Sequence, residues 1–143
     1  MKKRKITVII EASSTGFGAY TEDDFPCITG YANTVPKVKT DFQEAIKGYL
    51  EMDQEEGIND PRLNNGELEF VYKYDLESIF AHFGMLEITA FARRVGMNES
   101  LMRQYKAGLA KASDKQKKKI EDGLRELGRE LQSARLVYKK KKK

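Results

Sequence analysis

The 143-residue sequence contains only one cysteine, Cys27, and only one histidine, His82. A lone cysteine excludes a disulfide within the chain, and these two residues are too few for a thiolate or imidazole metal site. No apolar run approaches the ~20 residues that span a bilayer, and the apolar segment after the basic start MKKRK is too short for a signal peptide. These absences favour a protein of the reducing cytoplasm with no membrane association, no metal and no cofactor.

Positive and negative charges are separated along the chain. Residues 1–75 carry 9 Lys and Arg against 14 Asp and Glu, a net charge of −5. Residues 76–143 carry 17 against 8, a net charge of +9. The anionic half suits a cationic protein and the cationic half suits nucleic acid. The alternative is that both halves are ordinary solvated surfaces.

Hydrophobic periodicity predicts the order β-β-β-α-β for residues 1–75, because β-branched or alternating segments flank one stretch with helical spacing. The expected strands lie at 5–11, 17–21, within 27–33 and at 67–74. The expected helix covers 35–53, with Thr34 as its N-cap. A single helix covers one face of such a sheet, which leaves a strand edge available to a partner.

The apolar period changes from 2 to 3.6 near Asp75, which predicts an all-helical domain of four helices over 76–135. Asp75 and Ser113 are the expected N-caps of the first and last helix. The lysine-rich segment 136–143 is expected to be a disordered basic tail, which either attracts phosphates or is simply a solvated end. The predicted fold class is therefore α+β, a sheet domain at 1–75 followed by an all-α domain.

The segment ITAFARRVGMNESLMRQYKAG, residues 88–108, predicts two short helices joined by a tight turn. Gly96 tolerates the positive φ that the turn needs, and Asn98 is suited to cap the second helix. The small Ala92 lets the two helices approach closely. This is the layout of a DNA-reading helix-turn-helix, although an ordinary helical hairpin with a solvated face would share it.

The second helix of this motif would direct polar side chains toward base edges and phosphates. The expected DNA-binding residues are Thr89, Asn98, Glu99, Ser100, Arg103, Gln104 and Lys106.

Three segments in this order resemble the HicB antitoxins of bacterial type II toxin–antitoxin systems, in the form with a C-terminal Cro/repressor-like helix-turn-helix. They are the hairpin ending in GFGAYTEDDFP, the turn from Gly30 to Thr34 before the helix with Glu44 and Ala45, and FARRVGMNESLMRQYKAG. The resemblance runs from about Lys5 to about Ser133. The chain departs from the family at Ala32-Asn33, where members often have a glycine and an acid, and at Pro36-Lys37.

The resemblance implies a partial ribonuclease-H-like first domain (the HicB domain) without nuclease activity. That domain would bind and block a small basic HicA toxin, an mRNA-cleaving ribonuclease. The second domain would bind double-stranded operator DNA and repress the toxin–antitoxin operon, and the protein would form a homodimer or higher homo-oligomer.

Other interpretations of the sequence remain open. The chain could be a stand-alone helix-turn-helix transcription regulator whose N-terminal domain dimerises or senses a ligand. Glu11, Glu44 and Asp75 could together bind a divalent metal for nuclease chemistry, but no His or Lys cluster accompanies them, so no catalytic residue and no enzyme activity is expected. Cys27 is expected to contribute to packing.

A dimer could form through either of two surfaces. One is the exposed strand edge, and the other is the apolar stripe of Leu124, Leu127 and Leu131 on the last helix. The sequence does not choose between them.

Overall fold

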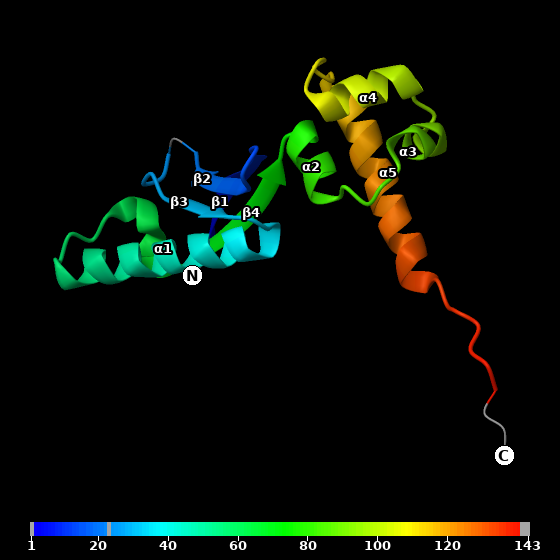
Figure 1. Cartoon of the computed structure of the whole chain (residues 1–143). Coiled ribbons are helices and arrows are strands. Elements are labelled where there is room, and N and C mark those ends of the chain that lie inside the picture. The colour runs from blue at the N-terminus through cyan, green and yellow to red at the C-terminus, as the bar shows by residue number, and fades with distance from the viewer. Residues whose placement is uncertain (1, 23, 141–143) are drawn as a thin grey trace. The chain divides into compact units, whose positions relative to one another are not determined.

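The computed structural model describes residues 2–22 and 24–140. The chain divides into two compact units, one that ends at Leu86 and one that begins at Glu87. The first combines a four-stranded sheet with helices and the second is helical, so the fold class is α+β (Figure 1).

The division falls after helix α2 (Leu76–His82), whereas the sequence placed the domain boundary at residue 75, before this helix. The reason is that α2 packs on strands of the sheet. The buried hydroxyl of Ser78 accepts a 2.8 Å hydrogen bond from the N–H of Ala12. The two residues are distant in sequence, so the apolar periodicity could not show that α2 belongs with the sheet.

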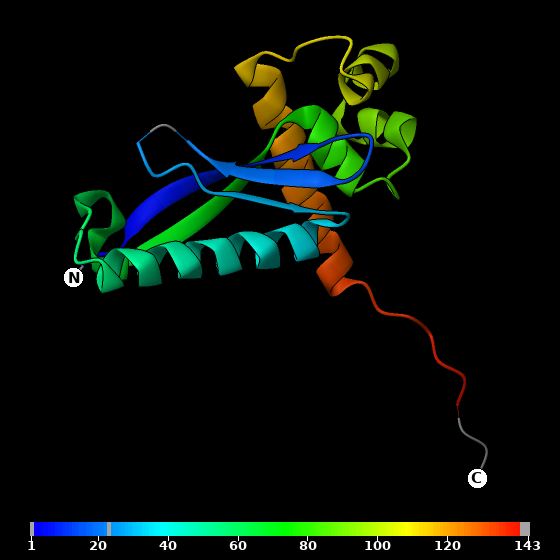
Figure 2. The ribbon, with the colours of Figure 1, turned by 60° about the vertical axis from the view of Figure 1, so that its left-hand side comes forward.

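The strand order in the sheet is β3-β2-β1-β4. The strands are β1 (Arg4–Ala12), β2 (Phe17–Thr21), β3 (Thr29–Ala32) and β4 (Leu68–Tyr74). The first three pair antiparallel in succession, and β4 pairs parallel with β1. Parallel pairing requires a crossover connection, which helix α1 (Val35–Glu55) provides as it runs along one face of the sheet (Figure 2).

The main core lies between α1 and that face. Ile6, Val8 and Ile10 alternate along β1 and are buried, as is Phe42 of α1. The apolar side chains of β4 lie on the same face, as the alternation predicted, but are only half-buried, because α1 packs mainly against β2 and β3. These side chains are Leu68, Phe70, Tyr72 and Tyr74.

The connection between α1 and β4 contains a short 3₁₀ helix, η1 (Pro61–Gly66). Two asparagines within it, Asn64 and Asn65, have positive φ, a conformation that asparagine tolerates better than most residues.

Cys27, expected to contribute to packing, is exposed, so that expectation was wrong.

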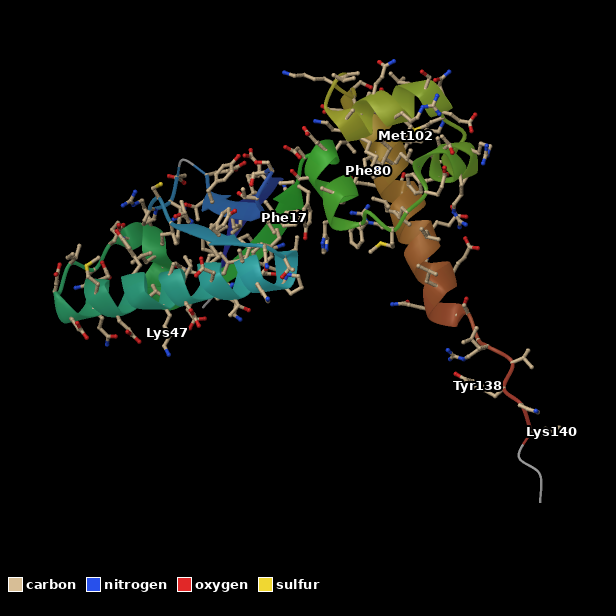
Figure 3. The ribbon with its side chains drawn as sticks, viewed as in Figure 1. Phe17, Lys47, Phe80, Met102, Tyr138 and Lys140 are labelled. Carbon is tan, nitrogen blue, oxygen red and sulfur yellow. The ribbon has the colours of Figure 1, made fainter. Side chains whose placement is uncertain are left out.

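The second unit contains α3 (Ile88–Val95), α4 (Glu99–Ala107) and α5 (Asp114–Ser133). Its buried side chains come from all three helices; Met102, labelled in Figure 3, has no exposed surface. The buried hydrophobic residues are Phe91, Ala92, Met102, Tyr105 and Ile120.

Of the predicted tail, the described residues up to 140 are exposed and form neither helix nor strand; Tyr138 and Lys140 mark this segment in Figure 3. The last three lysines of the predicted tail, 141–143, lie outside the described residues.

Candidate nucleic-acid interface

Three residues, 96–98, join α3 to α4. Gly96 ends α3 in the left-handed conformation with φ 71°, and the N–H of Met97 donates to the carbonyl of Ala92 at 2.9 Å. Asn98 begins α4 by accepting the N–H of Leu101 at its Oδ1, 2.8 Å away. One helix therefore ends and the next begins within three residues, as a helix-turn-helix requires.

Apolar contacts hold α3 against α4. Ala92 and Met102 have no exposed surface, and Tyr105 is 4% exposed. Helices α3 and α4 are in contact, and a small buried side chain such as Ala92 allows packed helices to approach closely. The outward face of α4 is therefore fixed by the residues on its inward face.

Helix α5 supports the pair from behind the turn. Lys119 donates from Nζ to the carbonyl of Gly96 at 3.1 Å, and Arg94 of α3 forms ion pairs with Glu126 and Glu130 of α5. At Gly123 the helices nearly touch: a Cβ there would lie 2.2 Å from Cγ1 of Val95. Neither the lysine contact nor the glycine contact was foreseen from the sequence.

Four of the seven expected DNA-binding side chains lie free on the surface of the second unit. Within the described residues, no hydrogen bond or ion pair engages the exposed side chains of Ser100, Arg103, Gln104 and Lys106. A free guanidinium can donate two hydrogen bonds to guanine, and a free carboxamide can pair with adenine. These are the two side chains of α4 best suited to read base edges.

The other three expected residues already have partners inside the unit. The carboxamide oxygen of Asn98 caps α4, and Glu99 accepts a 2.7 Å charged hydrogen bond from Arg93. Thr89 donates to Glu87 at 2.5 Å. These side chains contribute to the geometry of the motif, and among the described residues the NH₂ group of Asn98 has no hydrogen-bond partner.

Glu87 is the N-cap of α3, a role that the sequence did not indicate. Its carboxylate caps α3 by accepting the N–H of Ala90 and the hydroxyl of Thr89. These hydrogen bonds stabilise the ionised form, so the pKa of Glu87 lies below its usual value. Glutamate is not among the preferred N-cap residues, which is why it gave no signal.

The second unit is strongly cationic: residues 87–143 contain 17 Lys and Arg against 7 Asp and Glu. Lysines crowd the N-terminal half of α5, where Lys115 and Lys117 are exposed and Lys118 pairs with Asp122 at 3.4 Å. Further along α5, Glu126 and Glu130 pair with Arg94, and Glu121 and Asp122 pair with Arg125. The uncompensated positive charge is suited to a polyanion.

The first unit has a groove between α1 and the β4 side of the sheet. It consists of two adjoining cavities of about 410 and 360 Å³ that share Leu50, Gln54 and Gly66. Its lining mixes apolar side chains with polar ones, among them three carboxylates and one lysine. These charged residues are Lys47, Glu51, Asp53 and Asp60. Arg62 pairs with Asp60 at 2.7 Å and lowers the pKa of that carboxyl.

The three carboxylates considered for metal chemistry have other environments. Glu11 accepts the hydroxyl of Tyr20 at 2.7 Å, which raises the pKa of Tyr20 to about 12. Asp75 caps α2 through the N–H of Ser78, and Glu44 is exposed on α1. Across residues 2–22 and 24–140, no three His, Cys, Asp or Glu side chains are placed to share a metal ion.

No protein-family model matches the chain, and neither a curated protein nor a solved structure is similar to it beyond chance. In the part of the chain that the structure describes, no helix combines the length and apolarity needed to cross a membrane.

Proposed function

We propose that the chain is a DNA-binding antitoxin of the HicB type and not an enzyme. In this proposal the second unit binds operator DNA and represses its own operon, and the first unit neutralises a basic, mRNA-cleaving HicA-type toxin in the cytoplasm. The observation that carries the proposal is the pair α3 and α4, joined by Gly96 to Asn98, with the unpaired side chains of Arg103 and Gln104 on the outer face of α4.

DNA binding would place α4 in the major groove. Arg103 and Gln104 lie three and four residues after Ser100, so these three exposed side chains share one side of the helix. Arg103 and Gln104 would contact base edges, and Ser100 and Lys106 would contact phosphates. The helix is nine residues long, which suits an element that enters the groove by its N-terminal half.

Toxin binding would use the anionic first unit, whose residues 6–75 carry a net charge of −9. Helix α1 supports this assignment, because its C-terminal end bears Glu51, Asp53 and Glu55 and no basic residue in its last turn. Acids at a helix C-terminus oppose the helix dipole and reduce stability. A cationic partner on the adjoining groove would offset that cost. The order β-β-β-α-β of the main elements from β1 to β4 also supports the resemblance to the HicB domain, although α2 adds a further helix to the unit.

Fluorescence anisotropy tests the first role, with labelled duplex DNA from the region upstream of the chain's own gene. Arg103→Ala and Gln104→Ala should each weaken binding by about 1–3 kcal/mol if they contact bases. Arg129→Ala is the matched control, since Arg129 is an exposed cation of the same unit outside α4. Equal affinities for the wild type and both α4 variants would contradict the assignment of α4.

Calorimetric titration tests the second role, with the small basic protein encoded beside this chain. The wild type and Arg103→Ala should bind it equally well, because the proposed toxin surface lies on the first unit. Operator binding without any toxin binding would instead favour a stand-alone transcription regulator.

A further inference from the structure

The two edges of the sheet differ in how they are protected. At the β3 edge, the outward N–H of Tyr31 donates to Asp41 of α1 at 2.8 Å, and the strand is only four residues long. The β4 edge is seven residues long, and within the described residues no side chain caps its backbone. An uncapped strand of this length is a template for pairing with another strand.

Strand β4 has the sequence LEFVYKY, whose chemistry is complementary to itself in the antiparallel direction. If two copies pair about a two-fold axis at Val71, Glu69 of each lies opposite Lys73 of the other. On the other face, Phe70 lies opposite Tyr72 and Leu68 lies opposite Tyr74. Opposite charges and paired aromatic residues on directly facing positions both stabilise antiparallel strands.

The structure of the first unit agrees with this register on both faces of the sheet. Glu69 and Lys73 are exposed and share the face that α1 does not cover. Phe70 and Tyr72 are half-buried beside Phe42, at ring distances of 5.4 and 6.3 Å from it. The groove beside α1 exposes part of this apolar row, including Leu68 and Phe70. A second strand alongside would remove more of that surface from water.

We propose that the chain forms a two-fold homodimer by antiparallel pairing of β4 with β4 of a second copy, in the register that places Glu69 opposite Lys73. The two sheets then form one continuous sheet of eight strands, since each contributes four. The dimer does not require DNA. It supplies the two helix-turn-helix units that a palindromic operator needs, because one such unit contacts only one half-site.

The alternative apolar stripe on α5 is a weaker dimer surface. Leu124 and Leu127 are half-buried within the second unit, and only Leu131 is largely exposed, at 65%. One exposed leucine among charged neighbours is common on protein surfaces and needs no partner.

Substitutions that reverse the charges of Glu69 and Lys73 test the dimer. The mass of each variant in solution, without DNA, is measured by analytical ultracentrifugation. The wild type should be dimeric, and Glu69→Lys and Lys73→Glu should each weaken dimerisation by about tenfold or more, because each turns two attractive pairs into two repulsive ones. An equimolar mixture of the two variants should restore the dimer, since every pair across the axis is then of opposite charge. The double exchange Glu69→Lys/Lys73→Glu should also be dimeric.

Two controls separate loss of the interface from loss of the fold. Glu69→Lys places a lysine beside Lys5 in the same sheet, so its unfolding curve is compared with that of Lys73→Glu, whose neighbour on β1 is Ile9. Glu44→Lys changes an exposed charge on α1 and should leave the mass unchanged. A wild type that is still monomeric at the highest protein concentration measured would overturn the proposal. So would a dimer that both single variants retain, or single variants whose mixture fails to reassociate.

Discussion

Replacing Gly123 by alanine should destabilise the second unit, although the same change in most helices is favourable. A Cβ built at Gly123 lies 2.2 Å from Cγ1 and 3.4 Å from Cβ of Val95, and 3.6 Å from Cζ of Phe91. Val95 cannot easily turn away, because a β-branched side chain in a helix is held in one preferred rotamer. Helices α3 and α5 must therefore separate slightly or repack.

The magnitude follows from two opposing effects. Glycine to alanine in a helix interior contributes about 0.5–1 kcal/mol of stability, while overpacking a core contact costs about 1–3 kcal/mol. The net expectation for Gly123→Ala is a loss in the range of about 0–2.5 kcal/mol, centred a little above 1 kcal/mol. Gly128→Ala lies on the same helix with nothing within 4 Å of its Cβ, and should stabilise by about 0.5–1 kcal/mol.

Amide hydrogen exchange of α3 and α5 is the suitable assay, because two compact units need not unfold together. Exchange in these helices should be faster in Gly123→Ala and slower in Gly128→Ala, and Val95→Ala should relieve part of the loss in the double variant. If the two glycine substitutions stabilise equally, the close approach of α5 to α3 is not present in solution.

Two further predictions concern pH. The pKa of Glu87 is lower in the folded chain than its ordinary value of 4.5. The ionised carboxylate therefore stabilises α3 above pH 4.5, and this stabilisation is lost as the pH falls through the folded pKa. Glu87→Gln should speed amide exchange in α3 at pH 7 and make that exchange less dependent on acidic pH. Burial beside Tyr74, with Lys39 nearby, lowers the pKa of His82, so the neutral ring belongs to the folded state and stability falls as pH drops below 6.5. The urea midpoint of the first unit should therefore be lower at pH 5.5 than at pH 7.5, and His82→Gln should remove most of that difference; an unchanged difference would contradict the assignment.

Local signals in the sequence were sufficient for most element boundaries. Thr34, Asp75, Asn98 and Ser113 each accept the backbone N–H three residues ahead, as N-caps do. Gly96 has the positive φ expected of it. These features depend on a few neighbouring residues, so a single sequence contains them.

Contacts between distant residues could not be predicted in the same way. The bond from Ala12 to Ser78 assigns α2 to the sheet unit, and the contact of Gly123 with Val95 sets the spacing of α5. Neither residue type signals such a partner in the sequence. The parallel pairing of β4 with β1 could not be predicted from the sequence either. Without that pairing, the sequence does not show which face of the sheet carries the charged residues of β4.

In the candidate site too, some features follow from the local sequence and others depend on contacts between helices. Exposure of Arg103 and Gln104 follows from helical periodicity, because the buried Met102 and Tyr105 fix the opposite face. The partner of Glu99, which is Arg93 on the preceding helix, depends on the packing angle of α3 and α4. Side chains that could contact DNA and side chains that hold the motif together look alike until the fold is known.

Backbone amide shifts of the isotope-labelled chain, titrated with duplex DNA from upstream of its own gene, test the central claim most directly. The account predicts that the largest changes fall on residues 98–106, above all at Arg103 and Gln104, with the sheet of the first unit unaffected. Changes confined to the first unit, or none in α4 at saturating DNA, would contradict it.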